Sequence, residues 1–530
     1  MATTTPVLIV GGGLTGLSTA LFLAHQGVGC MVVERQFGTT VQYKFRGISP
    51  RSMEIYRGVG IEAEIRAHRT GDQQGGGIAR LRNLADPDVH WDRDAAWPPV
   101  EQLSVTDAAT CDQDQLEPIL REHAQRLGAD LRFGTELGRV EQDGTEVRGW
   151  LTDLRTGAEH RVTAEYLVAA DGAAGTVRRA LGIPRHGPGA LQHWMNLIFN
   201  TRLRPVLEGR RFTACFVTDI NGSIVARDDS GRWRLALPYH PEKGERPEDF
   251  DQQRCLELVR RAAGRPDVEA TLVDARAWEV AGYVADRFRD GRIFLVGDTA
   301  HVIPPTGGFA GNTGIHDAHN LAWKLAHVLN GLAGPGLLDS YDPERRPVAE
   351  RTLAQALARL QTWYHNPELP LPPPEPVLDD YTVVFGYRYR SGAVIAEDDA
   401  DDRMFEDPRE PTGRPGTRAP HVLLQRKTDT LSTHDLFGRG FALLTGPAGS
   451  RWGGAAERIA AESFRDLHWH CLSRDGDLRD ILNRWLPAYS VGEDGAVLVR
   501  PDGFIAWRSR SAAADPERTL RAVLDRLSAR

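Results

Sequence analysis

The 530-residue sequence carries 64 basic against 72 acidic residues, a net charge of −8, and is 41% hydrophobic and 26% charged. This length exceeds one compact core, so we expect several domains, and the acidic balance without a basic stripe disfavours a nucleic-acid partner. No apolar run is long enough to cross a bilayer, and the start "MATTTPVLIV" lacks the features of a secretion signal. Five scattered cysteines without CxxC spacing fit a reduced environment. We therefore expect a cytoplasmic enzyme or binding protein without a membrane partner.

The first fifty residues predict a β-α-β unit. An apolar, β-branched run over residues 6–10 is typical of a buried parallel strand, and the leucines that follow share one face of a helix ending near Gly27. A second apolar run, "CMVVER", reaches Glu34.

The turn between this strand and helix has the spacing of a dinucleotide-binding loop. Gly11, Gly13 and Gly16 form GxGxxG, which permits a tight turn, a close approach of backbone to a pyrophosphate and close helix–strand packing. Glu34, at the end of the next strand, is placed to accept hydrogen bonds from ribose hydroxyls. Glycine-rich turns are common, but the strand, helix and acidic residue together favour a dinucleotide over an ordinary turn.

Two later apolar runs end in the same manner. Residues 166–170 stop at Asp171-Gly172, and residues 292–296 stop at Gly297-Asp298. Strands that end in Asp and Gly suggest one sheet whose carboxyl edge binds a ligand. The loop "PPTGGFAGNTG" over residues 304–314 then exposes main chain to a large flat group, and the helix after it directs its positive end there. We expect that group to be a flavin, because reduced flavin carries negative charge on one edge.

The remaining patterns divide the chain. Short, turn-bounded strands between residues 190 and 275 predict an inserted antiparallel sheet, and the run 367–376, rich in proline, predicts a stiff connector. Helices are expected over residues 312–330 and after residue 341, the second kinked or started at Pro347, with a small α/β unit from about residue 415. We predict an α/β protein with a Rossmann-like domain at 1–180 and 276–395, a substrate-binding β-sheet domain at 181–275 and a third domain at 410–530.

Longer motifs carry a family resemblance. "GGGLTG", "ADGAAGTVRRALG", "IFLVGDTAH" and "GGFAGNTGIHDAHNLAWKL" resemble the class A FAD-dependent aromatic hydroxylases of the p-hydroxybenzoate hydroxylase fold. "GISPRSMEIYRGVG" and "LSTHDLFGRGFALL" are closer to its polyketide hydroxylase branch, which includes aklavinone and tetracenomycin hydroxylases. The resemblance implies a thioredoxin-like C-terminal domain; its redox cysteine pair is absent here, so it is expected to be structural.

The resemblance also implies the site. FAD contacts are expected from Gly11, Gly13, Thr15, Gly16, Glu34, Arg35, Gln113, Leu137, Asp171, Gly297, Asp298, Gly308, Gly311 and Asn312. Relatives place Arg where this chain has Lys44, with Arg46 nearby, and lysine lacks the planar fork of arginine, so flavin movement or NADPH handling could differ. Tyr239 and Arg388 or Arg390 are candidates for favouring the phenolate of the substrate, although ion pairing is as good a reading of either arginine. Tyr239, Arg388 and Arg46 are taken as the candidate catalytic residues.

The implied reaction is a monooxygenation. NADPH reduces FAD, O2 adds to form a C4a-hydroperoxide, and one oxygen atom passes to a polycyclic aromatic polyketide in antibiotic biosynthesis. Baeyer–Villiger insertion, oxidative decarboxylation or antibiotic inactivation on the same scaffold stays open, as does a protein that binds flavin or polyketide without turnover. A monomer or homodimer is expected.

Several histidines and tryptophans have plainer readings. His468 and His470 share a strand face, but without a second ligand cluster no metal site is expected. His301 and His316, near the glycine loop, are read as structural rather than proton-relaying. For Trp194 and Trp233, lining a substrate cavity and filling a core are equally good readings.

Overall fold

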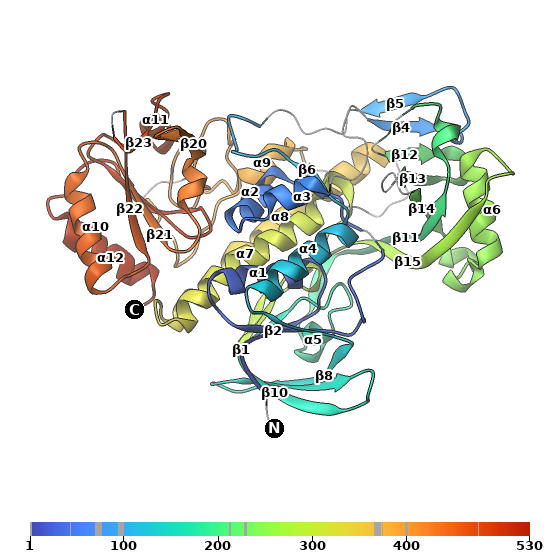
Figure 1. The fold of residues 1–530 in the computed structure, drawn as a ribbon, viewed down its shortest axis with the longest axis horizontal. Coiled ribbons are helices and arrows are strands. Elements are labelled where there is room, and N and C mark those ends of the chain that lie inside the picture. Colours follow the sequence, from blue (N-terminus) through green and yellow to red (C-terminus); the bar gives the residue numbers. More distant parts are fainter. Residues whose placement is uncertain are drawn as a thin grey trace.

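The computed structural model forms three bodies arranged along its longest axis (Figure 1). It describes residues 3–42, 44–68, 77–93, 100–210, 212, 214–226, 231–364, 371, 373, 375–397, 401–474 and 476–530. A central body of helices over a parallel sheet lies between a mainly antiparallel sheet on one side and the C-terminal body on the other. Most of the proline-rich connector predicted at 367–376 lies outside the described residues.

The central sheet brings the three predicted strand ends to one edge. Its strands run in the order β16-β17-β10-β1-β2-β7, and β1 pairs in parallel with both β2 and β10, as β10 does with β17. Val10 is level with Ala169, and Ala169 with Leu295, so the three turns that follow leave the sheet together. The prediction of one sheet with a shared carboxyl edge is confirmed. The strands of this sheet are β1 (Thr3–Val10), β2 (Cys30–Glu34), β7 (Asp130–Phe133), β8 (Thr135–Gln142), β9 (Val147–Asp153), β10 (Glu159–Ala169), β16 (Arg289–Asp290) and β17 (Ile293–Leu295).

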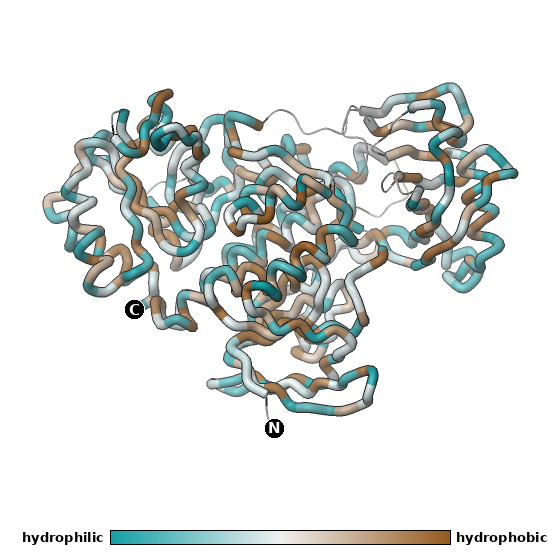
Figure 2. The backbone as a smooth tube through the Cα atoms, in the orientation of Figure 1, coloured by the Kyte–Doolittle hydropathy of each residue, from teal (hydrophilic) through white to brown (hydrophobic). Residues whose placement is uncertain are grey.

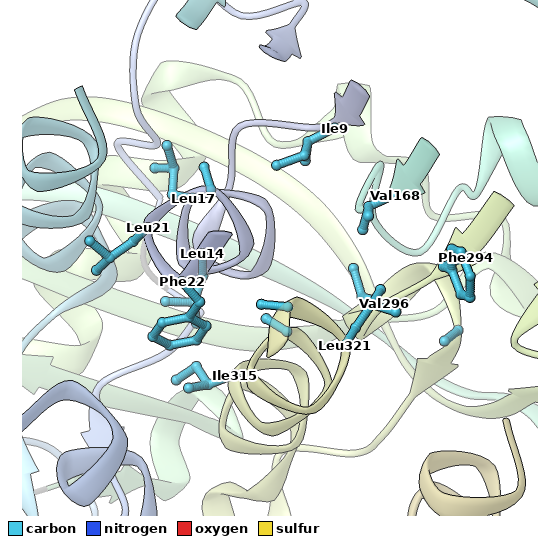
Figure 3. Packing of buried hydrophobic residues seen from close by; sticks show 14 of the residues in the cluster. Ile9, Leu14, Leu17, Leu21, Phe22, Val168, Phe294, Val296, Ile315 and Leu321 are labelled. Atoms are coloured by element: carbon cyan, nitrogen blue, oxygen red, sulfur yellow. The ribbon is translucent and has the colours of Figure 1, made fainter. Parts of the chain in front are cut away.

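Helices α1 and α7 pack side by side against this sheet and form the centre of the main core (Figure 3). Leu17 and Leu21 of α1 and Ile315 and Leu321 of α7 are fully buried there. Gly314 permits the close approach, because a Cβ at that position would lie 2.6 Å from Thr15 Oγ1 of α1. The helices of the central body are α1 (Leu14–His25), α2 (Pro50–Gly58), α3 (Glu62–Ala67), α4 (Gln113–Arg126), α5 (Thr176–Ala180), α7 (Phe309–Leu329), α8 (Tyr341–Tyr364) and α9 (Asp380–Phe385), with a small sheet of β3 (Gly47–Ile48) and β6 (Ala109–Thr110).

One helix boundary differs from the sequence pattern: α7 begins at Phe309 rather than residue 312. Helix α8 begins at Tyr341 and contains Pro347, so the helix predicted after residue 341 does not start at this proline. Pro347 is the seventh residue of α8, beyond the first turn, so it removes one hydrogen bond of the helix. Packing of α8 in the main core offsets this loss.

The second sheet contains strands from outside the predicted substrate-binding domain at 181–275. Its order is β18-β15-β11-β14-β13-β12-β4-β5, so it extends past residues 181–275 at both ends. Strand β12 pairs in parallel with β4, a long-range contact that no local pattern signals. Its elements are β4 (Ile78–Leu81), β5 (His90–Arg93), β11 (Arg185–Thr201), β12 (Ala214–Val217), β13 (Gly222–Ala226), β14 (Arg232–Tyr239), β15 (Ala270–Ala285) and β18 (His301–Val302), with helix α6 (Gln252–Ala263) packed on one face.

The C-terminal body is a mixed sheet in the order β20-β19-β23-β22-β21-β24-β25. The small α/β unit predicted from about residue 415 is present as strands and helices of this body. Among the described residues no group of side chains has the composition and spacing of a metal site, and His468 and His470 lie along β22. The elements are β19 (Leu423–Arg426), β20 (Asp429–Ser432), β21 (Phe441–Thr445), β22 (Leu467–Ser473), β23 (Leu478–Arg479), β24 (Ala496–Val499), β25 (Ile505–Ser509), α10 (Ser450–Glu462), α11 (Trp485–Tyr489) and α12 (Pro516–Leu527).

Hydrophobic residues concentrate inside the three bodies rather than along one exposed helix (Figure 2). Within the described ranges, every helix is too short or too polar to span a bilayer.

Candidate functional site

A large cavity lies between the carboxyl edge of the central sheet and the second sheet. It encloses about 1080 Å³, and both sheets contribute to its wall. Single-ligand pockets rarely exceed roughly 1,000 Å³. The cavity therefore has room for an extended cofactor together with part of a second molecule.

The turn between β1 and α1 forms one end of the cavity, and its three motif glycines have different tasks. A Cβ on Gly11 would lie 2.2 Å from the carbonyl oxygen of Ala170, and one on Gly16 would lie 1.9 Å from that of Gly11. Gly13 lines the cavity, and a Cβ there would have no neighbour closer than 3.7 Å within the protein. Gly11 and Gly16 thus permit the turn and its packing, whereas Gly13 leaves room for a ligand at the start of α1.

The start of α1 suits the diphosphate of a dinucleotide. The first backbone N–H groups of a helix have no intrahelical partner and carry the positive end of its dipole. Leu14 and Thr15, the first two residues of α1, line the cavity beside Gly13. This end of the cavity therefore has the features of an anion site formed by main chain.

Glu34 is held at the cavity wall by main-chain amides. Its Oε2 accepts a hydrogen bond from Gly12 N at 2.7 Å and its Oε1 accepts one from Gln36 N at 2.8 Å. Glu34 lines the cavity, where its carboxylate can meet ribose hydroxyls as predicted. Arg35 is exposed and does not reach the lining.

A second carboxyl, Glu117 of α4, was not found by sequence reasoning. It is almost fully buried, lines the cavity near Gly13, and accepts hydrogen bonds from Thr40 N at 2.9 Å and Gln113 Nε2 at 2.8 Å. Burial raises the pKa of Glu117 to about 7. Gln113, a predicted FAD contact, also lines the cavity and accepts a hydrogen bond from Lys44 N. The helical period of α4 places Glu117 one turn after Gln113, which is the only sequence signal that could have indicated it.

The carboxyl edge of β17 presents Asp298 to the cavity. The Asp298 side chain is exposed and lines the cavity wall. The preceding residue, Gly297, is held by a hydrogen bond to α7. Gly297 N donates to Asp317 Oδ2 at 3.1 Å, and that buried carboxylate also binds His301 Nε2 at 2.6 Å and Arg345 Nε at 2.7 Å. His301 is therefore structural, as predicted.

The glycine loop before α7 serves packing more than expected. Gly311 lines the cavity, but the space a Cβ would need there is filled by the Phe45 ring at 2.4 Å. Gly308, the residue immediately before α7, has a positive φ of 69°. Asn312, predicted to lie under the flavin, is outside the lining; its amide binds Ser49 N, Gly47 O and Gly308 O.

The second sheet supplies an aromatic and polar wall. Trp278, Tyr283 and Tyr239 line the cavity together with Asn196 and Arg234, and Trp278 Nε1 donates to Asn196 Oδ1 at 3.0 Å. Trp278 carried no distinguishing pattern in the sequence. Trp194 packs against it with ring centroids 6.1 Å apart, outside the lining, and Trp233 fills the core of the sheet.

Tyr239, a candidate substrate contact, is the last residue of β14 and lines the cavity. Burial, with Glu279 and Glu248 as further causes, raises the pKa of its phenol. A neutral phenol is a hydrogen-bond donor and acceptor, so Tyr239 can bind a substrate oxygen but does not act as a resident base.

Four further predicted side chains, in addition to Arg35 and Asn312, lie outside the cavity lining. Arg46 forms a bidentate ion pair with Asp112 at 2.7 and 3.0 Å and donates to Ala226 O, which ties the loop before β3 to α4 and β13. Arg388 pairs with Asp401 at 3.3 Å outside the cavity lining, the ion-pair reading considered above. Leu137 packs on the β8–β9 hairpin, and Asp171 caps α5 through Val177 N and accepts from Thr299 Oγ1.

Three arginines form a positively charged rim beside the turn after β10. Arg178, Arg179 and Arg185 all line the cavity. Burial and then the neighbouring charges of Arg185 and Arg179 lower the pKa of Arg178. Mutual repulsion of this kind is relieved by a bound anion.

These features define a dinucleotide-binding flavoprotein, and comparisons with known proteins agree. Residues 4–356 match the FAD binding domain family, and residues 412–530 match the C-terminal domain of aromatic-ring hydroxylases. The chain is 42% identical to 4-methyl-5-nitrocatechol 5-monooxygenase of a Burkholderia species over 98% of both chains. It is 40% identical to tetracenomycin A2 monooxygenase-dioxygenase of Streptomyces glaucescens, covering 99% of this chain and 97% of that protein.

The fold agrees equally well. A crystal structure of aklavinone-11 hydroxylase in a ternary complex with FAD and aklavinone superposes with a TM-score of 0.91 at 39% identity, covering 99% of both chains. The chain belongs to the family of FAD-dependent aromatic-ring hydroxylases, and it is a flavoprotein monooxygenase.

Proposed function

We propose that this protein hydroxylates a polycyclic aromatic polyketide, using NADPH as reductant and O2 as the oxygen source. The observation that carries the proposal is the single cavity in which the Gly13–Glu34 end faces a wall of Trp278, Tyr239 and Asn196. A cofactor that enters at one end and a flat ring that stacks at the other would share one enclosure. Tetracenomycin A2 monooxygenase-dioxygenase, a relative at 40% identity, and the aklavinone-bound structure support a polycyclic substrate.

The chain's residues would hold FAD in an extended form. The amides at the start of α1 would bind the diphosphate, Glu34 the adenosine ribose, and Asp298 the ribitol side. FAD, once bound and reduced, supplies the activation of O2 and the transfer of one oxygen atom. The C4a-hydroperoxide route and the Rossmann-like and thioredoxin-like assignments remain predictions from the family resemblance.

The protein's part is to orient the ring and exclude water. Trp278 offers an aromatic face, and its indole N–H is already satisfied by Asn196, so the ring is fixed for stacking. Tyr239 would bind a phenol or quinone oxygen of the substrate. The Arg178–Arg179–Arg185 rim would attract the phosphates of NADPH at the cavity mouth.

The deciding experiment is anaerobic stopped-flow reduction of the FAD-loaded protein by NADPH or NADH, with a panel of anthraquinones, naphthacenequinones and 4-methyl-5-nitrocatechol. The proposal expects a polycyclic compound to accelerate flavin bleaching and, after oxygen is admitted, a product 16 mass units heavier per oxygen consumed. Acceleration by nitrocatechol alone would move the substrate class to single rings. An inserted ring oxygen or lost CO2 would indicate Baeyer–Villiger insertion or oxidative decarboxylation, and no acceleration by any compound would favour a binding protein.

A further inference from the structure

The hairpin β24–β25 of the C-terminal body inserts its tip into the central body. Arg500 and Asp502, both in this tip, have side chains 0% and 2% exposed. Arg500 NH1 and NH2 donate to the two oxygens of Glu344 on α8 at 2.6 and 2.9 Å, and Arg500 Nε donates to Asp502 Oδ1 at 3.0 Å. Glu344 also binds Lys324 Nζ of α7 at 2.7 Å.

This buried cluster fixes the position of the tip. Two cations, Arg500 and Lys324, face two carboxylates, Glu344 and Asp502, all removed from water. Withdrawing the tip would take from the buried Glu344 carboxylate the two hydrogen bonds that Arg500 donates, which is unfavourable in a low-dielectric interior. The arrangement therefore tolerates one placement of the hairpin.

The same tip holds helix α2. Asp502 O accepts a hydrogen bond from Arg51 NH2 at 2.6 Å, and Arg51 NH1 donates to Glu54 Oε2 at 3.0 Å. Glu54 is also paired with Arg418 of the C-terminal body. Phe504, at the other side of the tip, packs on the rings of Tyr389 and Tyr387 with centroids 4.2 and 5.5 Å away.

Helix α2 in turn contacts the first turn of α7. Ser49 N and Ser52 Oγ both donate to Asn312 Oδ1, at 2.9 and 2.7 Å, and Ser52 Oγ lies 3.1 Å from His316 Nε2. His316 Nδ1 is 3.4 Å from the hydroxyl of Tyr387, the ring on which Phe504 packs. Asn312 follows Gly311, which lines the cavity.

We infer that the β24–β25 tip is a positioning element for the FAD site: it sets the placement of the first turn of α7 through Phe504, α2 and Ser52. The C-terminal body would then act on the flavin without touching it. The inference rests on FAD occupying the cavity as proposed above. Because spatial continuity alone is not evidence of energetic coupling, the test must measure coupling directly.

The experiment compares Phe504→Ala, Ser52→Ala and the double variant. FAD binding to apoprotein is titrated by flavin fluorescence, and amide hydrogen exchange of residues 308–314 is measured on the apoprotein. Each single variant is expected to raise the FAD Kd several-fold, up to about tenfold, and to speed exchange in this segment. The FAD Kd of the double variant should not exceed the larger of the two single-variant Kd values, because both substitutions interrupt the same connection. If Phe504→Ala does not fold, Phe504→Leu takes its place in the cycle.

The matched control is Asp435→Asn. It breaks the Arg57–Asp435 ion pair, which also joins α2 to the C-terminal body but is partly exposed, and should leave the FAD Kd within about twofold. Effects that multiply in the double variant, or a lowered thermal midpoint with unchanged FAD Kd and exchange, would overturn the inference. A wild-type protein that binds no FAD would instead refute the proposed function, while the exchange data on apoprotein would still test the positioning role.

Discussion

At the scale of single residues, Glu117 is the most unusual group in the cavity wall. Its carboxyl is buried beside the turn that would hold the diphosphate, and burial raises its pKa from 4.5 to about 7. Between these two values the folded protein keeps a proton that the unfolded chain releases. Rising pH therefore disfavours the folded state across this window, by up to about 3 kcal/mol once both states are ionised.

Replacing Glu117 by glutamine removes this titration. The difference in unfolding free energy between Glu117→Gln and wild-type apoprotein should increase in favour of the variant from pH 5 to pH 8, measured by urea unfolding. Any pH-independent cost of the amide cancels in this comparison. Glu122→Gln, at an exposed position of the same helix, should show no such trend, and a flat difference for Glu117→Gln would contradict the raised pKa.

Arg46 forms an ion pair with a buried carboxylate next to the cavity-lining residue Phe45. Its guanidinium pairs with Asp112, whose side chain is 0% exposed, so we expect Arg46 to stabilise the fold, while a catalytic role for it stays a prediction. Arg46→Met should lower the unfolding free energy by about 3 kcal/mol, because a buried carboxylate loses its bidentate partner. Lys44→Met, two residues away and exposed, should change it by less than about 0.5 kcal/mol. Equal effects in urea unfolding would argue against the ion pair as the main role of Arg46.

At the scale of elements, the β1–α1 turn separates folding from binding. A methyl group on Gly16 would collide with the Gly11 carbonyl, whereas one on Gly13 would enter the cavity. Gly16→Ala should destabilise the apoprotein by roughly 1–3 kcal/mol or more, while Gly13→Ala should keep the fold and weaken FAD binding at least tenfold. Thermal unfolding and fluorescence titration of both variants distinguish these effects. Normal FAD affinity in Gly13→Ala would place the diphosphate elsewhere.

The two sheets differ in how much of their strand arrangement the local sequence patterns predict. The apolar runs that end in Asp and Gly predicted the carboxyl edge correctly, because the run and the turn residues that follow it are local features of the sequence. The partners of β4 and β12 could not be inferred from their own residues, because pairing between distant strands depends on the packing of the whole sheet.

At the scale of the whole molecule, the central and C-terminal bodies share one interior. Trp323 and Leu337 of the central body belong to the same buried cluster as Leu443 and Phe441 of the C-terminal sheet, beside the ionic contacts of the hairpin tip. The two bodies are therefore expected to unfold as one cooperative unit.

Differential scanning calorimetry of the FAD-loaded protein should show one transition for these two bodies, with FAD release, followed by flavin fluorescence, at the same temperature. Leu443→Ala, a change in the C-terminal core only, should cost about 2–5 kcal/mol and shift unfolding and FAD release together. FAD retained above a separate C-terminal transition would show that the bodies unfold independently.

The sequence by itself determined the dinucleotide turn, the converging strand ends and the family, because these depend on glycine spacing, strand period and local motifs. It also predicted roles at the site for Glu34, Gln113, Asp298 and Tyr239, and the structure places all four in the cavity lining. The tertiary structure alone decided that Glu117 and Trp278 complete the wall and that Arg46, Arg388 and Asn312 lie outside it, each bound to other parts of the protein. A charged or amide side chain can bind either a ligand or another part of the protein. Which of the two it binds depends on the groups that distant segments place beside it, and these are known only from the tertiary structure.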